Sequence, residues 1–239
     1  MTAANFQLRH QGDHCLSIDF GDVISAETGL TCLAAANKIR KAQLAGVTDV
    51  VPSYIAVAVH YGPDPQTALP SFDSLSEQLI GLLKTGLPRT DLNARSIDIP
   101  VCYGGEHGPD LSAVAQTTGL TEQQVIELHC VPGSMVFMLG FAPGHPYIGI
   151  HDPLFALPRR DVPRTVVPAG SVAIANRQST IYSTLLPSGW HILGATPLKL
   201  FDLSRPQPSL LMPGDQLRFV PISPEEFDRL SVLAHSVAS

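Results

Sequence analysis

Hydrophobic positions along the first 92 residues follow two different periods. Leu16, Ile18 and Phe20 alternate with polar residues, and this period of two is typical of a strand with one buried face. Residues 72–86 space their leucines at three and four, which predicts a helix that stops at Gly86. A second helix is expected after Ser25, ending at Gly46, and residues 51–61 read as another strand. The pattern predicts a small α+β domain over residues 1–92.

The second half, residues 93–239, begins with one more strand and then changes character. Ile97, Ile99 and Val101 alternate, and two short helices follow, the second with a capping box of Thr121 and Gln124. From residue 135 onward, short apolar runs are separated by Pro and Gly, which favours a β-barrel or sandwich. The expected runs are residues 136–141, 171–175, 180–182, 191–193, 198–201 and 216–220.

Residues 141–165 interrupt this pattern with a long stretch of Pro, Gly and Arg: F-A-P-G-H-P-Y-I-G-I-H-D-P-L-F-A-L-P-R-R-D-V-P-R-T. A structureless loop of that length is uncommon in a compact domain and usually has a function or is disordered. Proline restricts φ and glycine permits positive φ, so we expect a stiff, irregular loop that holds polar side chains in place.

Composition narrows the classes of function. The chain is 44% hydrophobic with a net charge of -6 and has no run of basic residues, which argues against nucleic-acid binding. No apolar run reaches membrane-spanning length and the N-terminus does not resemble a signal peptide, so we expect a cytoplasmic protein without membrane contact. The four cysteines are scattered without a C-x-x-C, and no metal site is expected.

Five ordered motifs carry a resemblance: Y-G-G-E-H-G-P-D-L-S-A-V-A, L-G-F-A-P-G-H-P-Y-I-G, P-R-R-D-V-P-R, V-P-A-G-S-V-A-I-A and G-W-H-I-L-G-A-T-P. In order and spacing they resemble the family of the 5-oxoprolinase B subunit, also called allophanate hydrolase subunit 1 or the sporulation-kinase-inhibitor family. The resemblance covers nearly the whole second half and, more loosely, the first.

The resemblance implies an α+β N-terminal domain followed by a cyclophilin-like β-barrel domain. It also implies one component of an ATP-dependent hydrolase that opens the lactam 5-oxo-L-proline to L-glutamate and is inactive alone. The partners would be homologues of the C subunit, which is also called allophanate hydrolase subunit 2, and of the A subunit. The alternatives within the resemblance are a carboxyltransferase component acting on a urea-like amide, and a regulator that inhibits a histidine kinase.

The three arginines of the long loop are the first candidate site residues. Arg159, Arg160 and Arg164 can form bidentate contacts with a carboxylate or a phosphate, so we assign Arg159 and Arg160 to substrate binding and Arg164 to catalysis. The alternative is that they fasten the loop to Asp161, Asp152 or backbone carbonyls. His145 is expected near the loop surface, as a general acid or base or as an ordinary exposed histidine. Members of the family usually have Phe at this position.

Three further residues have both a structural and a functional interpretation, and a fourth, His129, has a structural one. Gln178, expected in a hairpin turn, can bond a lactam or urea-like amide. Tyr182 and Trp190 either line a substrate cleft or pack in a core or interface. His129 ends a helix, where a cationic side chain is favoured by the helix dipole.

ATP, if it is used, must bind the complex rather than this chain alone. The sequence has no G-x-x-x-x-G-K-[S/T] motif, and the Gly-rich residues 103–108 lack the lysine of a phosphate-binding loop. The hypothesis from sequence is therefore a site shared with a partner protein, one wall of which is the arginine-bearing loop.

Overall fold

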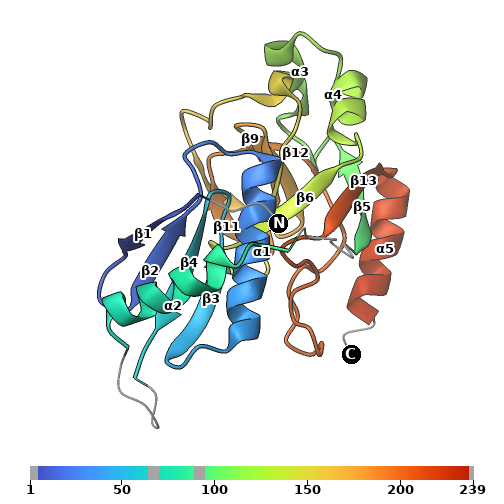
Figure 1. Cartoon of the computed structure of the whole chain (residues 1–239). Coiled ribbons are helices and arrows are strands. Elements are labelled where there is room, and N and C mark those ends of the chain that lie inside the picture. Colours follow the sequence, from blue (N-terminus) through green and yellow to red (C-terminus); the bar gives the residue numbers. More distant parts are fainter. Residues whose placement is uncertain (1–4, 64–69, 89–94, 237–239) are drawn as a thin grey trace. The chain divides into compact units, whose positions relative to one another are not determined.

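The computed structural model describes residues 5–63, 70–88 and 95–236. The chain divides into two compact units, Met1–Asn93 and Ala94–Ser239. Figure 1 traces the chain through them, from blue at the N-terminus to red at the C-terminus. We describe each unit by itself.

The N-terminal unit is a four-stranded antiparallel sheet whose strands run in the order β1-β2-β4-β3. Two helices pack on it and bury a single hydrophobic core. The elements are β1 (Gln7–His10), β2 (Cys15–Asp19), α1 (Ala26–Ala42), β3 (Val47–Pro52), β4 (Ala56–Tyr61) and α2 (Phe72–Lys84).

The predicted core face of β2 is confirmed: Leu16 and Ile18 are fully buried and Phe20 packs against them. The ends of the helices differ from prediction. Helix α1 ends before Gly46, because Gln43 already adopts the left-handed conformation that closes the helix. Helix α2 ends at Lys84, before Gly86. At its N-terminus it is capped by the Ser71 side chain.

The C-terminal unit is a closed barrel of seven strands in the order β10-β7-β6-β13-β5-β12-β9. Strands β5 and β13 are parallel and the other barrel pairs are antiparallel. Its strands are β5 (Ser96–Tyr103), β6 (Ser134–Leu139), β7 (Pro146–Gly149), β9 (Ser171–Ala175), β10 (Gln178–Ile181), β12 (His191–Ala195) and β13 (Gln216–Pro221). Strands β8 (Arg164–Val167) and β11 (Leu186–Ser188) form a separate two-stranded sheet.

The barrel is filled by the inward-facing residues of its strands. Ile99 and Val101 are fully buried there and Ile97 packs against them, which confirms the predicted face of β5. Strand β9 is buried on both sides: Val172 joins the barrel interior, and Ala173 belongs to a cluster on the outer face. The strand predicted at residues 198–201 is wrong, because Phe201 forms only an isolated bridge with Ser209.

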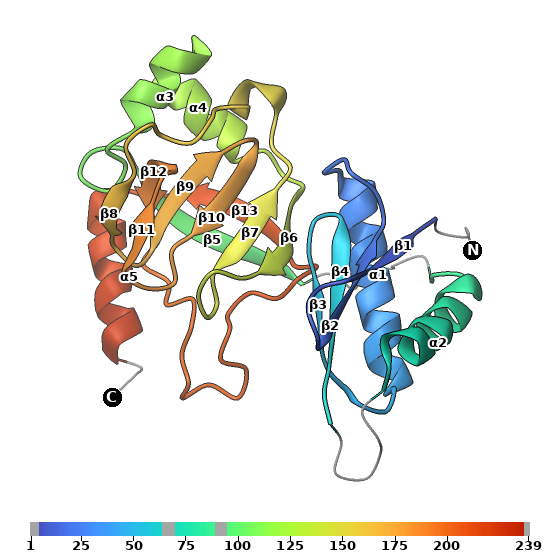
Figure 2. The same ribbon diagram turned by 90° about the vertical axis from the view of Figure 1, so that its left-hand side faces the viewer.

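Helices α3 (Leu111–Thr118) and α4 (Glu122–His129) cover one end of the barrel, and α5 (Pro224–Ser236) lies along its side (Figure 2). The predicted capping box of Thr121 and Gln124 is present at the start of α4. Asp110 stands at the N-cap of α3, but its side chain makes no capping bond. It is bonded to other parts of the unit instead.

Residues 141–165 are not the structureless loop that the sequence predicts. They contain strand β7, a 3-10 helix over Pro153–Phe155 and the first residues of β8. The three buried residues Ile148, Phe155 and Leu157 fasten the stretch to two of the hydrophobic clusters. Isolated apolar residues between prolines gave no period from which these elements could be predicted.

Gly108→Ala should strongly destabilise the C-terminal unit. A Cβ atom at Gly108 would lie 2.0 Å from the carbonyl oxygen of Leu193, and a backbone atom cannot move aside cheaply. We expect a loss of about 3 kcal/mol in the free energy of unfolding, measured with urea. Gly81→Ala in α2 is the matched control, since its Cβ would meet nothing within 4 Å and alanine favours the helix. Equal stability of the two variants would contradict this account of Gly108.

Candidate functional site

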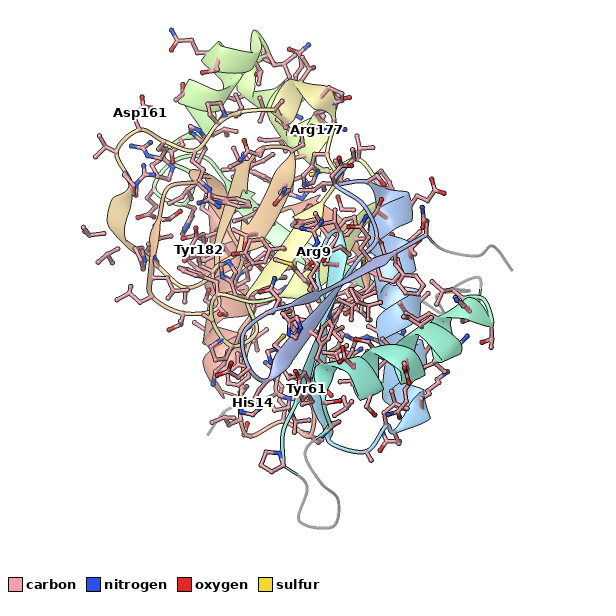
Figure 3. All side chains as sticks on the ribbon, turned by 60° about the vertical axis from the view of Figure 1, so that its left-hand side comes forward. Arg9, His14, Tyr61, Asp161, Arg177 and Tyr182 are labelled. Carbon is pink, nitrogen blue, oxygen red and sulfur yellow. The ribbon has the colours of Figure 1, made fainter. Side chains whose placement is uncertain are left out.

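An aromatic cluster on the outer face of β7 and β10 contains three of the residues chosen from the sequence. Because side chains alternate along a strand, Tyr147 points outward while Ile148 points into the barrel. The His145 ring lies 5.4 Å from the Tyr147 ring and 5.0 Å from the Tyr182 ring, centre to centre. Trp190 lies 6.1 Å from Tyr147. Figure 3 shows Tyr182 on this wall of the barrel.

The hydrogen bonds of His145 fix its tautomer. The Thr180 hydroxyl oxygen lies 2.7 Å from the Pro146 carbonyl oxygen and 2.6 Å from His145 Nε2. A carbonyl can only accept, so the single hydroxyl proton goes to Pro146, and Nε2–H of His145 must donate to Thr180. The lone pair is therefore on Nδ1, which is buried and has no partner among the described residues.

The prediction that His145 lies near the loop surface is wrong. Its exposed fraction is 2%, because the rings of Phe141, Tyr147 and Tyr182 lie around it, the first at 5.5 Å centre to centre. Burial lowers the pKa of His145 to about 4. At neutral pH the ring is uncharged and its Nδ1 can accept a hydrogen bond, but it cannot serve as a cation.

Arg159 lies over the aromatic cluster. Its guanidinium carbon is 5.9 Å from the centre of the Trp190 ring, within cation–π range, and the residue is exposed. Burial raises the pKa values of Tyr147 and Tyr182, and the positive charge of Arg159 partly opposes both shifts. Within the described residues, no carboxylate forms an ion pair with Arg159.

The other two arginines bind one buried carboxylate, Asp110. Arg164 makes a bidentate contact with it at 2.7 and 2.8 Å, and Arg160 donates to it at 2.8 Å. The backbone N–H of Ile192 also donates to Asp110, at 2.7 Å. Burial favours a higher pKa for Asp110, but the bonds from Arg164 and Ile192 outweigh it and hold the pKa below its ordinary value. The loop is thus fastened as the structural interpretation expected, but to a different carboxylate.

Gln178 lies on the same outer face as Thr180, two residues before it in β10. It is half-buried and is the first residue of the strand, not part of the turn. The turn itself consists of Asn176 and Arg177, both with positive φ. Arg177 donates its Nε to the His151 carbonyl at 2.9 Å and so holds the chain next to β7 (Figure 3).

His129 is buried in the barrel and is not the helix-capping cation expected from its position. Its ring nitrogens bond the Tyr103 hydroxyl at 2.7 Å and the Ser179 hydroxyl at 2.8 Å. Burial, and to a lesser extent the neighbouring His151, lowers the pKa of His129 well below its ordinary value. Burial likewise lowers the pKa of His151 to about 4. Both rings are neutral at pH 7 and act as parts of the core.

Asp110, Tyr147 and Thr180 were not singled out from the sequence. Asp110 resembled a simple helix cap, and Tyr147 and Thr180 resembled ordinary strand residues. Only the period of two could have grouped them. It places residues 145 and 147 on the same face of one strand, and residues 178, 180 and 182 on the same face of another. The pairing of β7 with β10, which brings Tyr147 opposite Thr180, comes from the fold.

Within the part of the chain that the structure describes, no group of three His, Cys, Asp or Glu side chains could hold a metal ion. The same residues include no helix long and apolar enough to span a membrane. The candidate site itself consists of the Arg159 cation over aromatic rings and the buried, neutral His145 imidazole.

Comparison with known proteins identifies the family. A family model described as the carboxyltransferase domain, subdomain C and D, matches residues 6–211. The B subunit of 5-oxoprolinase from Bacillus subtilis is 36% identical over 228 residues, covering 93% of this chain and 95% of that protein. The chain belongs to the 5-oxoprolinase B-subunit family. The resemblance carried by the five motifs is confirmed.

Solved structures agree with this membership. The crystal structure of TTHA0988 is 35% identical with a TM-score of 0.75, and the match covers 91% of this chain. This chain spans only 40% of the TTHA0988 chain. The urea amidolyase of K. lactis has a TM-score of 0.74 but 18% identity, covering 95% of this chain and 15% of that one, and shows the likeness of fold alone.

Acidification between pH 7.5 and 5 should lower the stability of the protein. A free imidazole has a pKa near 6.5, whereas His145 and His151 have values of about 4 in the fold. The unfolded chain therefore binds more protons in this window, and the free energy of unfolding falls as pH falls. We expect each of these histidines to account for a loss of about 2 kcal/mol, measured by urea unfolding at both pH values.

His145→Phe tests this assignment. The variant should lose about 2 kcal/mol less than the wild type over the same pH interval, because phenylalanine takes up no proton. Val162→Phe is the control, since Val162 is exposed and the change introduces a phenylalanine without removing a titratable group, so the pH dependence should be that of the wild type. If the free energy of unfolding of His145→Phe depends on pH as steeply as that of the wild type, His145 is not held neutral in the fold.

Asp110→Ala should destabilise the C-terminal unit far more than Asp98→Ala. Both carboxylates bind an arginine through two hydrogen bonds, but the Asp110 side chain is 5% exposed and the Asp98 side chain 52%. Removing Asp110 leaves two arginines and the Ile192 N–H without their acceptor, at a cost of about 3 kcal/mol. Asp98→Ala should have little effect, since it breaks a surface ion pair. Similar urea midpoints for the two variants would contradict the role of Asp110.

Proposed function

We propose that the protein is the B subunit of an ATP-dependent 5-oxoprolinase, which opens 5-oxo-L-proline to L-glutamate together with partner proteins. The observation that carries this is the match to the B. subtilis relative over 93% of this chain and 95% of that protein. The partners proposed are homologues of the C and A subunits, the location is the cytoplasm, and the chain is inactive alone. We further propose two domains, residues 1–92 and a cyclophilin-like barrel over 93–239.

The aromatic cluster supports a place for the substrate. 5-Oxoproline carries a carboxylate on a five-membered lactam ring. We propose that Arg159 binds the carboxylate and that Trp190 and Tyr147 contact the ring, with Tyr182 behind them. We propose that a partner protein closes the site over Arg159, which is exposed in this chain.

His145 is proposed to accept the lactam N–H. Its Nδ1 carries the lone pair and has no partner among the described residues, and its low pKa keeps it neutral at pH 7. Because Nδ1 is buried, the segment with Phe141 must shift to admit the substrate. In the overall reaction, water adds to the lactam carbonyl, the C–N bond breaks and the nitrogen takes up a proton, with ATP hydrolysed as a co-substrate.

Three other candidate residues have further proposed roles: Arg160, Arg164 and Gln178. Arg160 and Arg164 already bind Asp110, so they would meet an anion only by exchanging that carboxylate for it. We propose that they chiefly hold the loop, while a catalytic role for Arg164 stays a prediction. Gln178, on the outer face of β10, is proposed to bond the lactam amide.

The matched family model favours one alternative. Its description is a carboxyltransferase domain, so a component that transfers a carboxyl group to a urea-like amide is the second candidate. Assembly with a biotin-bearing partner, and urea-dependent ATP hydrolysis, would support that candidate over a 5-oxoprolinase.

The test is reconstitution with homologues of the A and C subunits from the same genome. We expect 5-oxoproline-dependent glutamate formation and ATP hydrolysis by the complex and almost none by this chain alone. Arg159→Ala should raise the KM for 5-oxoproline about ten- to a hundredfold, the worth of a hydrogen-bonded charge pair. Arg218→Ala, which removes an exposed ion pair with Asp98, is the control.

Different outcomes contradict different parts of the proposal. Glutamate formation by the isolated chain, or none by the complex, would overturn the function. Glutamate formation by the complex with an unchanged KM in Arg159→Ala would keep the function and overturn the place of the substrate. Thermal unfolding of each variant shows whether a loss comes from misfolding.

A further inference from the structure

A hollow of about 510 Å³ lies in the C-terminal unit, apart from the aromatic cluster. It is lined by residues 169–170, 183–184 and 196–201, and by Phe227 and Ser231 of α5. Sites for small molecules typically measure about 300–1,000 Å³. We call this hollow, which the function proposed above does not use, the Lys199 pocket.

The base of the Lys199 pocket is rigid. The Gly170 N–H donates to the Tyr182 carbonyl at 2.7 Å, and the Thr196 N–H donates to the Gly170 carbonyl at 2.9 Å. Gly170 has a φ of +85°, and a Cβ there would lie 2.4 Å from the Thr196 carbonyl oxygen. The two chain segments can meet this closely only because residue 170 is glycine, so the pocket is preformed.

The walls of the Lys199 pocket are apolar. The side chains of Leu198, Phe201 and Phe227 are half-buried and line it, and Leu200 is buried beneath them. Phe227 is held in place by the His107 ring, 4.2 Å away centre to centre. A ligand with an apolar body would remove these rings and chains from water, which stabilises the bound state.

One cation, Lys199, stands in the lining of the Lys199 pocket. Lys199 is the one charged residue among the described residues of the lining, and its side chain is 49% exposed. Its ammonium lies 3.1 Å from Asp202, whose carboxylate also accepts two bonds from Ser204. Arg205 donates to the Lys199 carbonyl at 2.9 Å, so two cations stand against one anion on this segment.

Another polar group of the lining, the Ser183 hydroxyl, has no partner among the described residues. The Ser183 hydroxyl oxygen is buried and makes no hydrogen bond to any described residue. An unsatisfied buried hydroxyl is costly, and a ligand group that accepts its proton would remove that cost. The hydroxyl and the Lys199 ammonium are both donors, so both favour an acceptor with negative charge.

We propose that the Lys199 pocket binds a small amphipathic anion: an apolar ring or chain that ends in one carboxylate or sulfonate group. The acid group lies near Lys199 and accepts from Ser183 once that side chain rotates to bring its buried hydroxyl into the pocket, and the apolar body contacts Leu198, Phe201 and Phe227. The site is separate from the one assigned to 5-oxoproline, and the proposal stands whether or not that function is correct.

Two fluorescent probes of the same shape test this. 1-Anilinonaphthalene-8-sulfonate carries the acid group, and N-phenyl-1-naphthylamine lacks it. We expect the wild-type chain to bind the sulfonate in a 1:1 complex with enhanced fluorescence. Lys199→Glu should weaken the sulfonate about tenfold or more, since an attractive charge becomes repulsive, and should change the affinity for the neutral probe less than twofold.

Three further variants separate the pocket from other surfaces. Lys199→Met, which adds no charge beside Asp202, should give an intermediate loss for the sulfonate. Thr184→Trp should fill the pocket and weaken both probes. Lys41→Glu, an exposed change of the same charge in α1, should leave both affinities unchanged. Thermal unfolding identifies any variant that is misfolded.

The proposal is overturned if the wild type does not bind the sulfonate 1:1. It is also overturned if the folded Lys199→Glu and Lys199→Met variants bind the sulfonate as tightly as the wild type. Binding of both probes to a folded Thr184→Trp variant with unchanged affinity would have the same consequence, because the probes would then be bound elsewhere.

Discussion

One buried carboxylate organises the candidate site. Asp110 binds Arg160, Arg164 and the Ile192 N–H, and so joins the start of α3, the strand β12 and the loop that leads into β8. A carboxylate without partners would be costly in this place, and the three donors compensate for its burial. The loop that carries Arg159 is thereby fixed at its next residue, and the Arg160 N–H bond to Gly189 holds it beside Trp190.

The barrel supplies the other half of the geometry. Small residues on the outer face of β9, Ala173 and Ala175, leave room for Tyr182 and Trp190 to pack flat against the wall. The Ser188 hydroxyl accepts from the backbone N–H of Trp190 at 2.9 Å and from the Tyr182 hydroxyl, so one side chain fixes both the Trp190 backbone and the Tyr182 ring. Aromatic rings fixed in this way make a surface that a cation or a ring can contact without reordering.

Sequence reasoning recovered the parts of this protein that have a period. The faces of β2 and β5, the capping box of α4 and the hairpin at Asn176 all follow from local rules, and the structure has them. It did not recover β7, β8 and β11, which have three or four residues each and contain Pro or Gly or are flanked by Pro. Strands this short are stabilised by their neighbours in the fold, so local pattern carries little information about them.

The same limit explains the misplacement of His145 and His129. A histidine flanked by Pro and Gly resembles a surface residue, and one at a helix end resembles a cap, because local sequence does not show which chain segments will cover it. Burial of both depends on contacts with Thr180 and Ser179, 35 and 50 residues away. The five motifs identified the family correctly, but they could not show which of their polar residues face a ligand.

The number of hydrogen bonds that Asp110 can accept distinguishes among the three arginines. Asp110 can accept about four hydrogen bonds, and Arg160, Arg164 and Ile192 already supply that number. Arg159 is adjacent in sequence but faces the π surface of Trp190, which attracts a cation weakly, and among the described residues its donors have no hydrogen-bond acceptor. An arginine whose charge is held by a ring and not by a carboxylate can still bind an anion from outside. For this reason Arg159, and not its two better-bonded neighbours, is the residue on which recognition of an acidic substrate should depend.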